Sequence, residues 1–254
     1  MFDVVYDFNS WQLHLQRALA SASSATRGFG SLCEVFLKKD YRFAVFGGFV
    51  RDLHLQGPGV VPRDIDIVVE GPTTSELSAL LADMDAPTSL NLYGGLRTTL
   101  AGTRFDIWPV EVTWAFREGL VSQSLENLPR TTFHNLDALA AVSSGSGFNL
   151  VEHGYLEAVH NRILRINLRE HPRPITVVAK TFSLVQRYGF ALDADLIAYM
   201  ADRLLVDDAS SVLSEVTRHY GYQTVHPGTL ARWIDEVREA GNHHAPQLAL
   251  SQLG

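Results

Sequence analysis

The stretch from residue 43 to residue 70, FAVFGGFVRDLHLQGPGVVPRDIDIVVE, constrains the fold of this chain more than any other. It predicts an apolar strand, a Gly47-Gly48 turn, a short helix, a loop rich in glycine and proline, and a second strand that carries Asp64 and Asp66. Because successive side chains of a strand alternate faces, both carboxylates point to one side and the apolar residues between and after them point into a core. The stretch therefore predicts a strand–helix–strand unit with two acidic groups on one face.

Two carboxylates on one face repel each other unless a cation neutralises them. A hard divalent cation such as Mg²⁺ suits this arrangement, because it prefers oxygen ligands and leaves coordination positions open for substrate phosphates. The Gly47-Gly48 turn lets the backbone approach a triphosphate closely, and the following helix offers unpaired N–H groups at its positive end. The unit therefore predicts a metal site and a phosphate site side by side.

Charge limits the kinds of partner that the chain can have. The formal net charge of −7 argues against a protein that coats DNA or RNA non-specifically, since such binding rests on many Lys and Arg contacts to phosphates. The charge is uneven, however, because six basic residues stand against one acid, Glu170, between residues 160 and 187. The basic residues are Arg162, Arg165, Arg169, Arg173, Lys180 and Arg187. This segment predicts a local basic surface suited to a polyanion.

The cysteine content and the hydrophobic pattern indicate a compartment. A single cysteine, Cys33, excludes an intramolecular disulfide framework and fits a reducing environment. The N-terminus has no basic segment ahead of an apolar run, and no apolar stretch is long enough to span a bilayer. We therefore expect a soluble, cytoplasmic protein without a membrane partner, whose oligomeric state stays open.

Local signals predict helices on both sides of a strand region. Asn9 or Ser10 is expected to cap a first helix, and Thr73-x-x-Glu76 is a capping-box pattern ahead of another. Between residues 88 and 108, short alternating segments separated by glycine turns predict a meander of strands, the last of which Pro109 should end or bulge.

The second half of the chain is expected to be mostly helical. Residues 132–142 predict a helix, and the SSGSG segment at 143–147 predicts a flexible connection. Further helices are expected at residues 175–188, 194–205, 213–220 and 230–239, with frayed chain after residue 241.

These elements together predict an α+β fold. Residues 1–145 would form a mixed or antiparallel sheet flanked by helices, and residues 146–254 would form a small all-helical domain.

The first motif resembles that of a known family. Gly47-Gly48-Phe49-Val50-Arg51-Asp52, followed by Asp64-Ile65-Asp66, resembles the motif that opens the head domain of class II CCA-adding enzymes and bacterial poly(A) polymerases. These enzymes belong to the DNA polymerase β superfamily of nucleotidyltransferases. The resemblance implies a polymerase-β-like palm in which Asp64 and Asp66 bind two Mg²⁺ ions. It also implies that Gly47 and Gly48 cradle the triphosphate and that Arg51 and Asp52 contact the nucleotide.

The superfamily completes its metal site with a third carboxylate on a neighbouring strand. The resemblance implies Asp106 for this role, with Glu111 as the second candidate because VEVTWAFR is similar to the family's strand that ends in Phe-Arg. The alternative for Asp106 is a strand-edge charge paired with Arg104 or Arg97.

A second motif is similar to the family's ribose-reading sequence Arg-Arg-Asp-Phe-Thr-Ile-Asn-Ala-Leu-Ala. Residues 130–140, RTTFHNLDALA, replace the second arginine and the aspartate by threonine and insert one residue. The resemblance leaves Arg130 and Asp137 as nucleotide contacts. The alternative is an amphipathic helix with a solvated polar face.

Residues 180–190, KTFSLVQRYGF, resemble the start of the family's neck helix, which adds Lys180 to the candidate nucleotide contacts. The family selects bases with a Glu-Asp-x-x-Arg signature, whose last two charged positions fall on Pro174 and Val177 here. Base templating is therefore expected to be absent. The resemblance covers residues 43–195, and the body and tail domains with which the family grips tRNA are expected to be missing.

The sequence thus predicts a Mg²⁺-dependent nucleotidyltransferase that uses an NTP as substrate. The expected acceptor is an RNA 3′ end, with tRNA among the candidates, reached along the basic segment of residues 162–187. Two alternatives stay open: a transferase that acts on a protein side chain or a small molecule, and a non-catalytic nucleotide-binding module.

Overall fold

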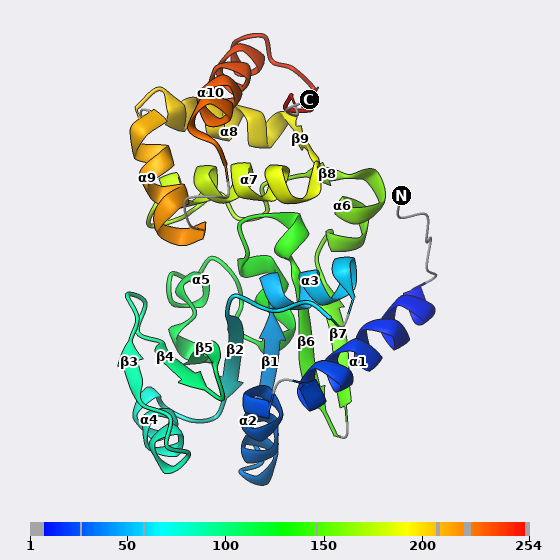
Figure 1. Cartoon of the computed structure of the whole chain (residues 1–254), viewed down its shortest axis with the longest axis vertical. Coiled ribbons are helices and arrows are strands. Elements are labelled where there is room, and N and C mark those ends of the chain that lie inside the picture. The colour runs from blue at the N-terminus through cyan, green and yellow to red at the C-terminus, as the bar shows by residue number, and fades with distance from the viewer. Residues whose placement is uncertain are drawn as a thin grey trace. The chain divides into compact units, whose positions relative to one another are not determined.

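The computed structural model describes residues 8–25, 27–57, 59–145, 147–206, 209–220 and 225–251. Its largest feature is a seven-stranded mixed sheet (Figure 1). The strands are β1 (Arg42–Phe46), β2 (Ile65–Glu70), β3 (Thr88–Leu90), β4 (Leu96–Leu100), β5 (Thr103–Pro109), β6 (Leu139–Ser144) and β7 (Gly147–Glu152). Their spatial order is β3-β4-β5-β2-β1-β6-β7. Neighbours run antiparallel except β2 and β5, which are parallel. The expected mixed sheet is thereby confirmed.

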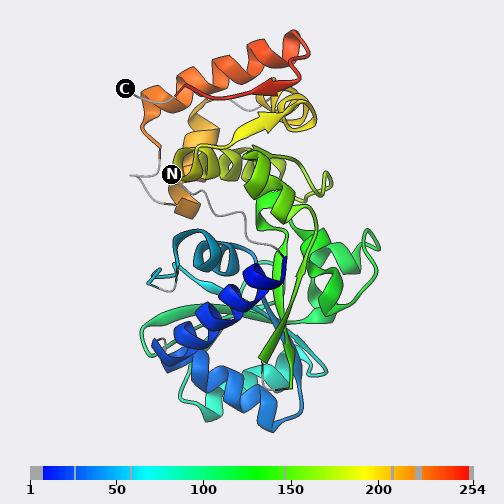
Figure 2. The same cartoon turned by 90° about the vertical axis from the view of Figure 1, so that its right-hand side faces the viewer.

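Both faces of this sheet are covered, as two successive residues of β1 illustrate. Phe43 points to the side of helices α1 (Phe8–Ala25) and α2 (Arg27–Lys38), and its ring centroid lies 5.4 Å from that of Phe36 in α2. Figure 2 shows both helices along one side of the sheet. Ala44 points to the other face, where it joins a buried apolar cluster. That cluster is closed by the short helices η1 (Val110–Val112), α5 (Trp114–Arg117) and η2 (Leu125–Thr131).

Several local predictions are confirmed. The meander of strands is present as β3, β4 and β5, and β5 ends at Pro109. The capping box precedes α4 (Thr74–Asp83): the Thr73 hydroxyl accepts a hydrogen bond from the Glu76 backbone at 3.3 Å, and the Thr73 backbone donates to the Glu76 carboxylate at 2.7 Å. These features depend on residues that are close in sequence, which is why local patterns predict them.

The predicted helix at residues 132–142 is wrong. Asn135–Asp137 form one short 3-10 helix, η3, and the strand β6 follows. β6 lies between β1 and β7, and its residues 139–142 are buried. Its sequence is therefore a continuous apolar run and lacks the alternation that marks a half-buried strand. The run ALAAV also has high helix propensity, which strand pairing overrides. The first helix differs as well, because α1 begins at Phe8 and so Asn9 and Ser10 lie inside it.

The second half contains the four expected helices, with shifted ends: α7 (Pro174–Tyr188), α8 (Ala194–Leu204), α9 (Ala209–Tyr220) and α10 (Pro227–Asn242). A further helix, α6 (Tyr155–Asn161), was not predicted. Their core includes Phe182 of α7 and Trp233 of α10, whose rings stack with centroids 6.0 Å apart.

This half is not all-helical, and residues 242–251 are ordered although a frayed end was predicted after residue 241. Residues 252–254 of that prediction lie outside the described residues. A small sheet with the order β10-β9-β8 joins β8 (Ile163–Leu164), β9 (Ala191–Asp193) and β10 (Gln247–Leu248). The Trp233 indole donates a hydrogen bond to the Ser251 carbonyl at 2.8 Å, and Leu250 is buried. Strands of two or three residues leave no alternating pattern long enough to detect, so only tertiary pairing defines them.

Backbone proximity divides the chain into two compact units. The first contains residues 1–132 and 137–153, and the second contains residues 133–136 and 154–254. The division expected at residue 145 falls instead inside the β6–β7 hairpin, which belongs to the first unit. No helix among the described residues is long and apolar enough to cross a membrane.

Candidate active site

Gly47 forms the turn between β1 and α3 (Gly48–Gln56). Its φ of +71° lies in the left-handed region that favours glycine, and its N–H donates to the Leu139 carbonyl of β6 at 3.1 Å. A Cβ at Gly47 would lie 3.9 Å from Oδ2 of Asp66. The glycine turn and the Asp66 carboxylate therefore lie against each other, as the sequence predicted for the phosphate and metal sites.

Strand register brings two of the predicted carboxylates together. Asp66 of β2 and Asp106 of β5 are Cα partners in the parallel pair, so their side chains share one face of the sheet. Asp64 directly precedes β2, two residues before Asp66. Glu111, the second candidate for the third carboxylate, lies on η1 beyond the end of β5 and is exposed. The backbone geometry therefore favours Asp106 over Glu111 as the neighbour of Asp66.

Arginines hold two of these three carboxylates. Arg97 of β4 is the Cα partner of Asp106 and donates from Nε to Oδ1 at 3.0 Å and from Nη2 to Oδ2 at 2.9 Å. Arg63 lies 2.9 Å from Asp64 in a second ion pair. The Asp106 carboxylate, with the further charges of Asp64 and Asp66, raises the pKa of Arg97. The sequence offered Arg97 and Arg104 as partners of Asp106, and Arg97 is the one that binds it. The pairing of Arg63 with Asp64 was not predicted, although the two residues are adjacent in the sequence.

The donor chemistry of this face fits Mg²⁺. All three side chains are carboxylates, the oxygen ligands that Mg²⁺ prefers, and Asp66 and Asp106 are fixed by strand pairing. As they stand, no three His, Cys, Asp or Glu side chains among the described residues gather closely enough to hold a metal ion. In this arrangement the Asp64 carboxylate pairs with Arg63 and the Asp106 carboxylate pairs with Arg97.

Arg51, Asp52 and Asp137 form a buried cluster beneath the glycine turn. Nε of Arg51 donates to Asp52 at 2.7 Å, and Nη1 donates to Asp137. The side chains of Arg51, Asp52 and Asp137 are 7%, 10% and 1% exposed, which leaves little surface for a nucleotide. A Cβ at Gly48 would lie 3.4 Å from Nη2 of Arg51. The cluster therefore supports the turn from below.

Arg130 and Asp137 do not share a surface in the structure. Arg130 is exposed on η2, whereas Asp137 is buried on η3. Direct contact of both with a ribose stays a prediction, and their different burial argues against a joint role.

The basic residues of the second unit lie among partners. Arg165 pairs with Glu157 at 2.7 Å, and Arg169 pairs with Asp195 at 3.4 Å. The Lys180 ammonium lies 5.6 Å from the Phe133 ring centroid. The ion pairs of Arg165 and Arg169 with Glu157 and Asp195 neutralise part of the positive charge that the sequence suggested for residues 162–187.

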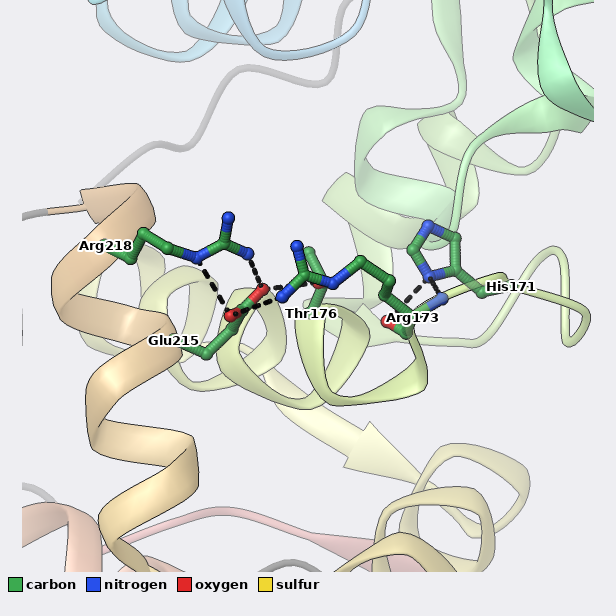
Figure 3. Close-up of polar contacts among 5 residues, drawn as sticks. All are labelled: His171, Arg173, Thr176, Glu215 and Arg218. Carbon is green, nitrogen blue, oxygen red and sulfur yellow. Dashed lines mark hydrogen bonds and ion pairs between the residues drawn. The ribbon is translucent and has the colours of Figure 1, made fainter. Parts of the chain in front are cut away.

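Figure 3 shows the most connected of these partners, Glu215 of α9. Its buried carboxylate accepts from Thr176 at 2.6 Å, from Arg173 at 3.3 Å and from Arg218 at 2.6 and 3.1 Å. In the same figure Nδ1 of His171 accepts from the Arg173 backbone at 3.0 Å. Burial lowers the pKa of His171 to about 4, and Lys180 and Arg173 add to this effect. His171 is therefore neutral at pH 7. The contacts of Glu215 with Thr176 and Arg173 connect α9 to α7.

Comparison with protein families and curated proteins finds no match to this sequence: no family model matches, and neither does any curated protein.

Solved structures show the fold. A CCA-adding enzyme in complex with ATP has a TM-score of 0.65 and 18% identity, over 91% of this chain and 55% of that one. The Thermotoga maritima CCA-adding enzyme in complex with tRNA has a TM-score of 0.58 and 20% identity, over 83% of this chain and 49% of that one. A tRNA nucleotidyltransferase complexed with a primer tRNA and an incoming ATP analogue has a TM-score of 0.57 and 16% identity, over 84% of this chain and 61% of that one. The chain spans about half to three fifths of these proteins and has their nucleotidyltransferase fold.

Proposed function

We propose that this chain, whose fold is that of tRNA nucleotidyltransferases, is a Mg²⁺-dependent nucleotidyltransferase that moves an NMP from an NTP to an acceptor hydroxyl. One observation carries the proposal: Asp66 and Asp106 are paired across parallel strands, and the Gly47 turn lies against the Asp66 carboxylate. Carboxylates beside a side-chain-free turn at a helix N-terminus combine metal ligands with a phosphate cradle. A structural role alone would not require acidic groups at adjacent positions on one sheet face, since they repel.

The chemistry is an in-line displacement at the α-phosphorus. The acceptor oxygen forms a bond to that phosphorus, the bond to the bridging oxygen breaks, and pyrophosphate leaves. Asp64, Asp66 and Asp106 would hold two Mg²⁺ ions, which when bound favour the deprotonated acceptor and neutralise charge on the leaving pyrophosphate. The backbone of Gly47 and Gly48 would position the triphosphate. The Arg51 guanidinium, paired with Asp52 and Asp137, would pack beneath the Gly48 backbone and keep the turn in place.

We favour an RNA 3′ end as the acceptor, because two solved structures of this fold contain tRNA. A protein side chain or a small molecule is the second candidate, supported by the partners that neutralise much of the basic segment. Base selection of the family kind is not expected, since Pro174 begins α7 and Val177 is buried.

Incubation with α-labelled NTPs, Mg²⁺ and total RNA, protein extract or small-molecule extract would test the proposal. Asp66→Asn keeps the side-chain shape and removes the charge, so we expect transfer to fall by at least about a hundredfold, the scale of losing a group that stabilises developing charge. Asp83→Asn, at the exposed end of α4, is the matched control and should retain full transfer.

The fraction that carries the label identifies the acceptor. Label in RNA that Asp66→Asn abolishes supports the favoured acceptor, and label in protein or small molecules supports the second candidate. If no fraction is labelled but Mg²⁺ and NTP together raise the Tm, the chain is a non-catalytic nucleotide-binding module. Absence of both label and Tm shift would refute nucleotide chemistry altogether.

A further inference from the structure

Arg97 binds the carboxylate of Asp106, which the proposed metal site needs as a ligand. Its guanidinium binds both oxygens of Asp106, at 3.0 and 2.9 Å, in the bidentate geometry that makes such pairs strong. The pairing is built into the fold, because Arg97 and Asp106 are Cα partners in the antiparallel pair β4–β5. A divalent cation and the guanidinium cannot share these oxygens without bringing two cations into contact.

The position of Arg97 makes it displaceable. Its side chain is 50% exposed, whereas that of Asp106 is 12% exposed. An arginine that can turn into water loses little when its partner is taken, since half-exposed ion pairs contribute modestly to stability. Asp106 has no such freedom, because it belongs to a central strand of the sheet.

The neighbouring charges explain why a cation belongs at this place. Asp66 lies beside Asp106 by strand register, and Asp64 is two residues further along the chain. Three carboxylates at one end of a sheet face would repel each other in the absence of a metal ion.

We propose that Arg97 is a resident counterion of the metal site, which neutralises Asp106 in the metal-free protein and is displaced when a divalent cation binds. The proposal rests on the proposed function, since it assumes that Asp64, Asp66 and Asp106 bind metal. Its consequence is a metal affinity lower than the three carboxylates alone would give. The chain thereby stays stable without metal at the cost of weaker metal binding.

Mn²⁺ titration followed by electron paramagnetic resonance, without nucleotide, measures the competition directly. Arg97→Gln removes the competing charge, so we expect Mn²⁺ to bind about three- to tenfold more tightly, the range set by a half-exposed bidentate pair. Arg97→Lys keeps the charge but cannot bind both oxygens in the same fork, so it should bind Mn²⁺ with intermediate affinity. The matched control is Arg104→Gln on β5, an exposed arginine two residues from Asp106 on the same face of the strand.

Thermal unfolding gives a second test, because the Mn²⁺-induced increase in Tm distinguishes a counterion of the metal site from a purely structural ion pair. We expect Arg97→Gln to lower the Tm without metal, because Asp106 loses its partner, and to show a larger Tm increase on Mn²⁺ addition than the wild type. A structural role predicts the same Mn²⁺-induced shift in both proteins.

Each result separates the inference from the function that underlies it. Equal Mn²⁺ affinity in wild type and Arg97→Gln overturns the role of Arg97 while the metal site stands. Equal tightening in Arg104→Gln also overturns it, because the effect would then be one of net charge. The proposed function fails if the wild type does not bind Mn²⁺, or if it binds Mn²⁺ with an affinity that Asp66→Asn leaves unchanged. In either case the metal site itself is absent. Should Arg97→Gln not fold, Arg97→Lys decides by the same comparison.

Discussion

At the scale of single residues, Arg42 and Arg51 make comparable contacts in very different surroundings. Arg42 bridges Glu70 and Glu126, and its side chain is 50% exposed. Arg51 bridges Asp52 and Asp137, and its side chain is 7% exposed. Water can replace the partners of Arg42 but not those of Arg51, so burial decides how much each arginine contributes.

We predict that Arg51→Met lowers the free energy of unfolding by about 3–5 kcal/mol, because it leaves two buried carboxylates without their shared cation. Arg42→Met, which also removes an arginine bound to two carboxylates, should cost about 1 kcal/mol or less. Urea denaturation of the two variants gives both values. Equal losses would contradict the conclusion that burial sets the contribution of the Arg51 cluster to stability.

At the scale of elements, local rules account for some boundaries and not for others. The start of α4 follows from its capping box, in which Thr73 and Glu76 satisfy each other's backbone N–H groups. The identity of β6 follows from its place between β1 and β7, against the helix propensity of its alanines. An element end is therefore predictable where it is formed by neighbours in sequence.

Thr73→Ala removes the hydroxyl that accepts from the Glu76 backbone, so we predict a loss of about 1 kcal/mol in the free energy of unfolding. Thr74→Ala is the matched control, since Thr74 is the first residue of α4 and alanine has the higher helix propensity. Chemical denaturation of both variants should show destabilisation by Thr73→Ala alone. Equal destabilisation would contradict a specific capping role.

At the scale of the whole molecule, each of the two units has a core of its own. The first is built on both faces of the seven-stranded sheet, and the second is built around α7, α9 and α10. Glu215 contributes to the second by binding Thr176, Arg173 and Arg218 at once. Loss of its charge should therefore act on that unit first.

We predict that Glu215→Gln raises amide hydrogen exchange in α7 and α9, with a stability loss of about 1–3 kcal/mol for donors left without a charged acceptor. Glu157→Gln is the control in the same unit, because its pair with Arg165 is about half exposed and should matter little. Exchange resolved by mass spectrometry locates the change. A uniform rise across β1 and β2 as well would argue against separate cores.

The sequence by itself determined the features that depend on nearby residues. These are the strand, glycine turn and helix of residues 43–56, the acidic pair Asp64 and Asp66, the capping box and the strand meander. Alternation, glycine conformation and capping act over a few residues, so their patterns survive in the sequence.

Only the tertiary structure decided which distant residues meet. The parallel pairing of β2 with β5 places Asp106 beside Asp66, and the antiparallel pairing of β4 with β5 places Arg97 on Asp106. Tertiary packing also brings Arg51 and Asp137 together in a buried ion pair, while their contact with a nucleotide stays a prediction. Register joins residues tens of positions apart, and a shift of one residue would move each side chain to the other face, so no local pattern contains it.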